Sequence, residues 1–284
     1  MRLASIVVDG ISHAALLVDD RLVLLRDLNA QWRTQFPEDL DGLVQMGAVD
    51  EVRRRVERVA PDMSHAIPRH TATWAPLLER PKNLWGVGLN FKQHAKDLGA
   101  DKSMPVPSGF HRPTTCLAGH ASTLRIPTSW GVITGEAEIG AVIGKPLFRA
   151  SRDEARAAIA GYTALLDLTA EELLRKDTRY IGRAKAFPQS VVVGPFLVTP
   201  DDWEPGADTT IKTLWNGEPK RSGQVRDMTW EPWSLLADFS HVFPWSPGDI
   251  LQTGTPGAVP LEPGGRLGAE VDGLPPLEAK IGSA

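Results

Sequence analysis

The sequence predicts a mainly β protein with a few short helices and a small N-terminal α+β domain. Two observations favour this class. The 284 residues include 26 glycines and 23 prolines, above the roughly 12% of average usage, so turns divide the chain into short segments. The apolar segments are rich in β-branched residues and bounded by turn formers, which is typical of strands. With 42% hydrophobic residues, the chain is expected to fold around a buried core.

The small N-terminal domain, with a linker, is predicted to comprise residues 1–80, and the larger domain residues 81–284. Turn-forming Asp-Gly and Asp-Asp pairs separate the first β-rich runs, which is typical of a β-meander. Valines spaced three and four residues apart predict a helix over 49–59. Residues 60–80 contain three prolines and no clear period, which indicates a surface linker.

Two capping boxes predict helices in the larger domain. Ser151 is followed three residues later by Glu154, so a helix is expected to start there and to run to about Gly161. Thr169 and Glu172 repeat the pattern and predict a second helix that begins after Thr169.

Charge and composition exclude several classes of protein. The chain carries 31 basic and 35 acidic residues, for a net charge of −4, without the basic excess typical of a nucleic-acid binder. A single cysteine, Cys116, excludes an internal disulfide and a cysteine-based zinc site. No segment approaches the roughly 18 apolar residues that a membrane span needs. We therefore expect a cytoplasmic protein without a nucleic-acid or membrane partner.

The run from Gly135 to Gly144 carries two acids in an otherwise apolar strand. Side chains alternate along a strand, so Glu136 and Glu138 point to the same face. Two buried carboxylates need a counter-charge, and their hard oxygen atoms select Mg²⁺, or Mn²⁺ or Ca²⁺, over zinc. The alternative is a strand whose polar face meets water.

Asp167 and Lys185 extend this set. Asp167 closes an apolar run, where an acid is unusual unless it has a partner. Its alternative role is that of an acid at a helix start. Lys185 lies among apolar neighbours in the sequence. It is either a lysine of the site or a surface lysine whose ammonium group reaches water.

Two glycine-containing loops carry further candidates. His94 and Asp97 are three residues apart, so on a helix the carboxylate can orient the imidazole for base catalysis. A surface histidine is the alternative. The second loop follows a predicted strand in the segment 248–256 and contains Thr253 and Gly254. Gly254 permits close approach of the backbone to a ligand.

Taken together, these segments resemble the fumarylacetoacetate hydrolase family, over most of residues 84–281. The matching segments are GVGLNFKQHA (86–95), GEAEIGAVIGK (135–145), GYTALLD (161–167), YIGRAKAF (180–187), GPFLVTPDD (194–202) and PGDILQTGTPGAV (247–259). The resemblance implies a mixed β-sandwich roll, a homodimer and a divalent metal cofactor, with Mg²⁺ expected.

The resemblance also implies roles for individual residues. The metal ligands would be Glu136, Glu138 and Asp167; the catalytic residues would be Lys185 and His94, with Asp97 in the place of the family's glutamate; Thr253 would contact substrate.

The sequence departs from the family after the metal aspartate. Glu171 and Leu174 stand where relatives commonly have a substrate-binding Arg and Gln. An acid repels an anionic substrate group, so either a cation of the next turn, Arg175, Lys176 or Arg179, is predicted to bind substrate instead, or the substrate is neutral at that point. Arg112 stands near the place of a family lysine.

The predicted function is metal-dependent hydrolysis of a carbon–carbon bond in a β-diketone or 2,4-diketo acid. One alternative keeps the site and changes the reaction, to a decarboxylase, tautomerase, or hydratase or dehydratase that acts through a metal-bound enolate. A second alternative is a metal-bound binding protein without catalysis.

Overall fold

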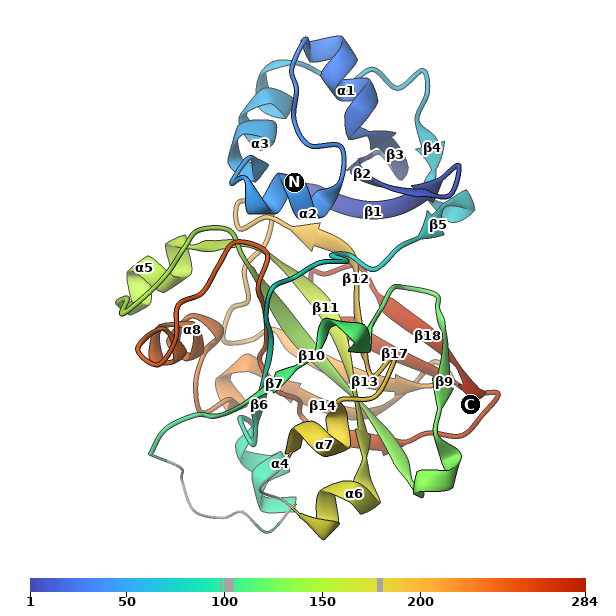
Figure 1. Ribbon diagram of the computed structural model, residues 1–284, viewed down its shortest axis with the longest axis vertical. Helices are drawn as coiled ribbons and strands as arrows, with labels where there is room; N and C mark the ends of the chain where they lie inside the picture. Colours follow the sequence, from blue (N-terminus) through green and yellow to red (C-terminus); the bar gives the residue numbers. More distant parts are fainter. Residues whose placement is uncertain (98, 100–104, 178–180) are drawn as a thin grey trace.

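The computed structural model describes residues 1–97, 99, 105–177 and 181–284. A small unit formed by the first 75 or so residues lies at one end of the molecule, above a larger β-rich body (Figure 1). The fold class predicted from the sequence is confirmed: strands dominate, the sheets are mixed, and the helices of the described residues are short. No helix in the described part of the chain is long and apolar enough to cross a membrane.

The small unit is a meander of strands with helices against one face. Its elements are β1 (Arg2–Val8), β2 (Ile11–Val18), β3 (Arg21–Leu24), α1 (Leu25–Trp32), α2 (Leu40–Gln45), α3 (Val49–Arg58), β4 (Ile67–Pro68), a 3₁₀ turn (Arg69–Thr71) and β5 (Thr73–Trp74). The predicted meander and the helix over α3 are confirmed. The linker prediction for 60–80 is wrong in part, because β4 pairs with β3 and β5 pairs with β1.

The larger body contains the remaining elements. They are β6 (Leu84–Gly88), α4 (Lys92–Asp97), β7 (Ser108–Arg112), β8 (Leu117–Ala118), β9 (Thr123–Ile126), β10 (Ile133–Ile143), α5 (Arg152–Ala157), β11 (Ile159–Ala170), α6 (Glu171–Lys176), α7 (Ile181–Lys185), β12 (Val191–Val198), β13 (Thr210–Trp215), β14 (Glu218–Gln224), α8 (Pro232–Ser240), β15 (Ile250–Gln252), β16 (Ala258–Pro260), β17 (Arg266–Val271) and β18 (Leu277–Ser283), with short 3₁₀ turns at Thr114–Cys116, Thr128–Trp130 and Val225–Asp227.

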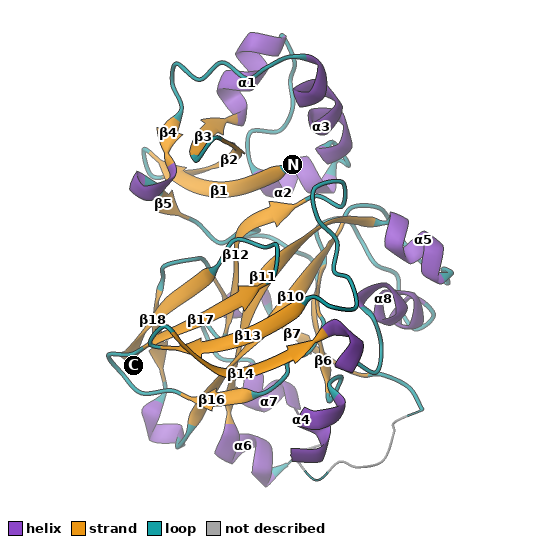
Figure 2. Cartoon of the chain, turned by 180° about the vertical axis from the view of Figure 1, so that it is seen from behind, coloured by secondary structure: helices purple, strands orange, loops and turns teal. Residues whose placement is uncertain are grey.

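Two sheets make up the architecture (Figure 2). The large sheet has the order β4-β3-β2-β1-β12-β11-β10-β15-β6-β7, and the small sheet has the order β14-β13-β17-β18-β9. Because β1 pairs with β12, the large sheet continues from the small unit into the larger body. Because the sheet is continuous, the domain boundary near residue 80 stays a prediction. The homodimer also stays a prediction.

The long central strand β10 is buried on both faces. Its odd-numbered residues, such as Ala137 and Ile139, lie in the core with Leu267 of the small sheet. A Cβ atom on Gly135 would lie 2.4 Å from a methyl group of Leu267, so the two sheets are in close contact there. The even-numbered residues of β10, including Glu136 and Glu138, point to the opposite face, on the inside of the rolled large sheet.

The capping boxes give one success and one error. Ser151 accepts a hydrogen bond from the Glu154 amide, and the Glu154 side chain accepts one in return, as predicted. The helix α5 ends at Ala157 rather than near residue 161, because β11 begins at Ile159. A helix does begin after Thr169, as predicted, because α6 starts at Glu171, but Thr169 does not cap it. Thr169 is part of β11, which pairs with β10 over its whole length, so sheet pairing overrides the local capping signal.

Candidate metal centre

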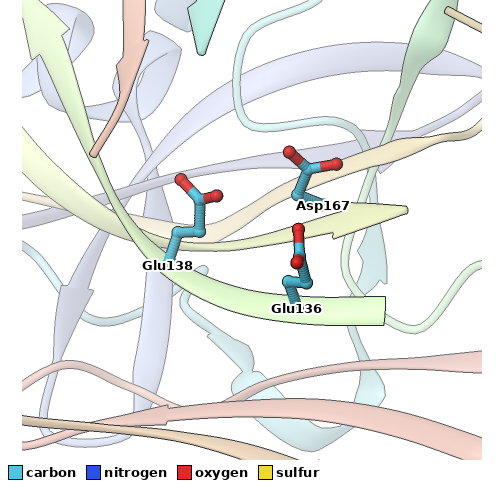
Figure 3. A group of neighbouring side chains, drawn as sticks. All are labelled: Glu136, Glu138 and Asp167. Atoms are coloured by element: carbon cyan, nitrogen blue, oxygen red, sulfur yellow. The ribbon is translucent and has the colours of Figure 1, made fainter. Parts of the chain in front are cut away.

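Three carboxylates meet on the inner face of the large sheet. Glu136 of β10 lies directly opposite Asp167 of β11, and Glu138 follows two residues along on the same face. One oxygen from each carboxylate can be chosen so that all lie within 4.8 Å of one another (Figure 3). The most exposed of the three, Glu136, is only 6% exposed.

This donor set fits a hard divalent cation. Metal–oxygen distances of about 2.0–2.6 Å allow one Mg²⁺, Mn²⁺ or Ca²⁺ ion to bridge oxygens that are less than 5 Å apart. The carboxylates also need a counter-charge. Burial, and then the charge of Asp167, raise the pKa of Glu138 well above its usual range. A divalent cation would offset both the burial of the carboxylates and their mutual repulsion. A set of oxygen ligands alone disfavours zinc.

Lys185, the last residue of α7, provides a cation beside the triad. Its Nζ atom donates hydrogen bonds to Glu136 (3.0 Å) and to Asp167 (2.9 Å), so it bridges carboxylates of both strands. Burial by itself would lower the pKa of Lys185, but the charges of Asp167 and Glu136 outweigh it and raise the pKa. The direction of this shift favours the ammonium form of Lys185, which donates hydrogen bonds to both carboxylates.

Arg112 of β7 is buried against Asp167, one of the three acids of the triad. The structure leaves its side chain 0% exposed and pairs its guanidinium with the Asp167 carboxylate. The same guanidinium donates to the backbone oxygen of Lys185 (2.6 Å). Arg112, which the sequence suggested as a substrate-binding residue, thus holds both Asp167 and Lys185.

Ser190 completes this support and was missed in the sequence. Its hydroxyl donates to the backbone oxygen of Lys185 (2.6 Å) and accepts from Arg112 (3.1 Å). It directly precedes the apolar strand β12, a position that does not distinguish it from a surface serine.

His94 of α4 also lies beside the triad, with Nε2 3.5 Å from an oxygen of Glu136. Figures 1 and 2 place α4, α6 and α7 together at the end of the molecule opposite the small unit. Asp97 ends α4, but its side chain lies outside the described part of the structure, and so does Arg179.

The loop after β15 supports the second glutamate of the triad. The Gly254 amide donates to Glu138 (2.8 Å). Thr253, predicted to contact substrate, is buried and donates its hydroxyl to the backbone oxygen of Ile139 (2.9 Å). Gly254 has φ +91°, and a Cβ atom there would lie 2.9 Å from Cβ of Asn90, so the loop requires glycine.

Asn90 ties this loop to the start of α4. Its amide nitrogen donates to the backbone oxygens of Thr253 (2.8 Å) and Trp230 (2.9 Å), and its Oδ1 atom accepts from the Trp230 amide (2.9 Å). Asn90 belongs to a segment that carries the family resemblance, but the sequence assigned it no role.

Glu171 is one of the positions where the sequence departs from the family, and it is the first residue of α6. Its carboxylate accepts a hydrogen bond from Thr134 (2.8 Å), which lies two residues before Glu136 on β10. Glu171 therefore lies beside the strand that carries Glu136 and Glu138, and its repulsion of an anionic substrate group stays a prediction.

Comparison with known families identifies the family of this chain. Residues 83–282 match the C-terminal region of fumarylacetoacetate (FAA) hydrolases, so the chain belongs to the fumarylacetoacetate hydrolase family. It is 33% identical over 192 residues to oxaloacetate tautomerase YcgM of Escherichia coli (strain K12), covering 66% of this chain and 87% of that protein. It is 28% identical over 222 residues to oxaloacetate tautomerase YisK of Bacillus subtilis (strain 168), covering 73% and 72%.

Solved structures share the whole fold. Maleylpyruvate hydrolase from Sphingobium sp. SYK-6, in complex with manganese(II) ion and pyruvate, superposes with a TM-score of 0.82 at 23% identity, covering 100% of both chains. Fumarylacetoacetate hydrolase from Exiguobacterium antarcticum superposes with a TM-score of 0.81 at 22% identity, again covering 100% of both chains. The predicted β-sandwich roll of this family is therefore confirmed.

Proposed function

We propose that this protein is a divalent-metal-dependent enzyme that acts on a small 2-keto acid through its enolate, and that the reaction is keto–enol tautomerisation of an oxaloacetate-like acid. The observation that carries the proposal is the position of Lys185, whose ammonium group bridges Glu136 and Asp167 inside a buried acidic triad. Several relatives are named oxaloacetate tautomerases, among them YcgM and YisK, and they support the choice of reaction.

The triad supplies the binding site. Glu136, Glu138 and Asp167 would hold the cation, with Mg²⁺ expected and Mn²⁺ or Ca²⁺ as alternatives. When bound, a divalent cation supplies positive charge that polarises a carbonyl group and stabilises negative charge on oxygen. Burial of the triad limits access of water, which strengthens every electrostatic interaction at the site.

Two side chains divide the proton chemistry. Lys185, as an ammonium group, would donate a hydrogen bond to the oxygen on which negative charge develops. His94 accepts the proton that leaves the carbon next to the carbonyl group and returns a proton to the opposite end of the enolate. Arg112 touches no reacting atom and acts by holding Asp167 and the Lys185 backbone.

Hydrolysis of a 2,4-diketo acid, the reaction predicted from the sequence, is the second candidate. It needs a base that can activate water beside the carboxylates, and the His94 ring, 3.5 Å from Glu136, is in that place. Decarboxylation and hydration or dehydration use the same enolate and are further outcomes of the test below.

The test is a substrate panel with metal-free protein and added Mg²⁺, Mn²⁺ or Ca²⁺. Loss of the enol of oxaloacetate would be followed by its ultraviolet absorbance, against the uncatalysed rate. Diketo acids and β-diketones would be incubated in parallel and their products identified by mass spectrometry. We expect metal-dependent tautomerisation to exceed hydrolysis.

Glu138→Gln provides the matched variant, because the amide keeps the shape of the side chain and an acceptor for Gly254 while it removes the charge. We expect it to remain folded and to lose turnover. Glu218→Gln, on the exposed strand β14, is the control that should leave turnover unchanged. Faster cleavage than tautomerisation would favour the hydrolase, and no metal-dependent turnover at all would favour a binding protein.

A further inference from the structure

Gln252, the last residue of β15, is a buried side chain whose amide has no partner. It is 0% exposed, and neither its Oε1 nor its Nε2 atom has a hydrogen-bond partner among the described residues. An unpaired buried polar group costs about 1–3 kcal/mol, so such groups are rare in folded proteins. The position therefore needs a physical explanation.

The register of the sheet places this side chain on the face of the triad. Gln252 lies directly opposite Gly140 of β10, and residues opposite each other in an antiparallel pair point to the same face. Gly140 shares that face with Glu138, two residues away. Gln252 and Glu138 are thus diagonal neighbours, at a separation of about 7–8 Å that long side chains can bridge.

Two glycines flank the Gln252 side chain, and neighbouring side chains pack over both of them, Thr163 over Gly140 and Phe110 over Gly86. Gly140 and Gly86 flank Gln252 on the neighbouring strands, in the same row across the sheet. A Cβ atom on Gly86 would lie 2.3 Å from the ring of Phe110, so that ring covers Gly86. The same ring lies 5.6 Å from Nζ of Lys185. Gln252 therefore lies in the row Gly140, Gln252, Gly86 and Phe110, two residues along the sheet from Glu138.

We propose that Gln252 is a substrate-binding residue of this site, whose amide pairs with a ligand that offers both an acceptor and a donor. The amide presents an N–H donor and a C=O acceptor side by side. A carboxylate can satisfy only the donor, whereas the enol of a 2-keto acid carries a carboxylate oxygen and a hydroxyl group. The inference rests on the proposed function and deepens it, since it names the group that recognises the enol hydroxyl.

The test compares two dicarboxylates that differ by one hydroxyl group, malonate and hydroxymalonate. Their affinities would be measured by calorimetry in the presence of saturating Mn²⁺ for the wild type, Gln252→Met and Gln252→Leu. We expect the preference for hydroxymalonate to fall about two- to tenfold in both variants, the worth of one hydrogen bond. Both ligands chelate the same ion in each protein. The change in the ratio of their affinities between the wild type and a variant therefore isolates the contribution of the hydroxyl–amide pair.

The stability of the ligand-free protein gives an independent readout. Because Gln252→Met removes unpaired polar atoms at nearly constant volume, we expect the Tm of the metal-free protein to rise by about 2 °C or more. Gln31→Met is the matched control. Gln31 lies on α1 and bonds to Ala60 (2.9 Å) and Asp62 (3.0 Å), so its replacement should not raise Tm and should leave both affinities unchanged.

Each outcome decides the matter. An unchanged hydroxymalonate preference, an equal weakening of both ligands, or no binding of either ligand to the wild type would overturn the proposal. A fall in Tm in Gln252→Met would do the same, because it would show that the amide supports the fold. Binding does not require turnover, so a failure of the tautomerase assay would leave this comparison intact.

Discussion

Arg112 and Asp167 form a buried ion pair across the inside of the rolled sheet. Three strands, β10, β15 and β6, separate their strands in the sheet order, yet the guanidinium contacts the carboxylate directly. The contact exists because the sheet curves and brings β7 over β11. Arg112 contacts the Oδ1 atom of this candidate metal ligand, while Lys185 contacts its Oδ2 atom.

Arg112→Met is expected to destabilise the protein by about 3–5 kcal/mol, because it leaves Asp167 buried with one cation fewer. Urea unfolding of the metal-free protein measures this loss. Ser190→Ala is the control: it removes hydrogen bonds but no charge, and about 1 kcal/mol is expected. An Arg112→Met loss no larger than that of Ser190→Ala would contradict the structural role of the pair.

Lys185→Met should separate metal binding from catalysis. The ammonium group competes with a cation for oxygens of Glu136 and Asp167, so its removal is expected to raise Mn²⁺ affinity, by about tenfold or more. Turnover should fall by at least about 100-fold, since the donor to the developing oxyanion is lost. Calorimetry and a steady-state assay on the same sample check both effects. Weaker Mn²⁺ binding in the variant would show that Lys185 orients the carboxylates rather than competing for them.

The stability of the metal-free protein should fall as pH rises through the raised pKa of Glu138. The folded state holds this proton more tightly than the unfolded chain, so the stabilisation is complete below the ordinary glutamate pKa and is lost above the folded one. Glu138→Gln should remove this dependence. Metal affinity should increase over the same range, because the ligand must lose its proton. Urea unfolding at a series of pH values, with and without Mn²⁺, tests both expectations, and parallel curves for the two proteins would contradict them.

His94→Gln distinguishes between reactions. Its loss is expected to lower tautomerase or hydrolase turnover by about 100-fold or more, the usual worth of a general base. Mn²⁺ affinity should remain within about threefold, since His94 is not among the triad ligands. Decarboxylation of oxaloacetate that survives the substitution would identify the reaction as one that needs no base. Wild-type tautomerisation in this variant would exclude His94 from the proton transfer.

Local patterns predicted the elements that depend on neighbouring residues. The meander, the helix α3 and the capping box at Ser151 follow from turns, periodicity and hydrogen bonds within a few residues. The same rules failed at Thr169, where pairing with β10 determines the backbone, and in residues 60–80, where β4 and β5 join strands distant in the chain. Sheet pairing is a long-range interaction that no short window contains.

The sequence alone determined three features: the abundance of glycine and proline, the shared face of Glu136 and Glu138, and the unusual acid at Asp167. The shared face follows from the sequence because side chains alternate along a strand. Only the tertiary structure decided what surrounds them. It turned Arg112 inward as the partner of Asp167, joined Ser190 and Asn90 to the support of the site, and left the Gln252 amide without a partner. These contacts depend on how a rolled sheet brings distant strands together, and that curvature is set by the packing of the whole chain.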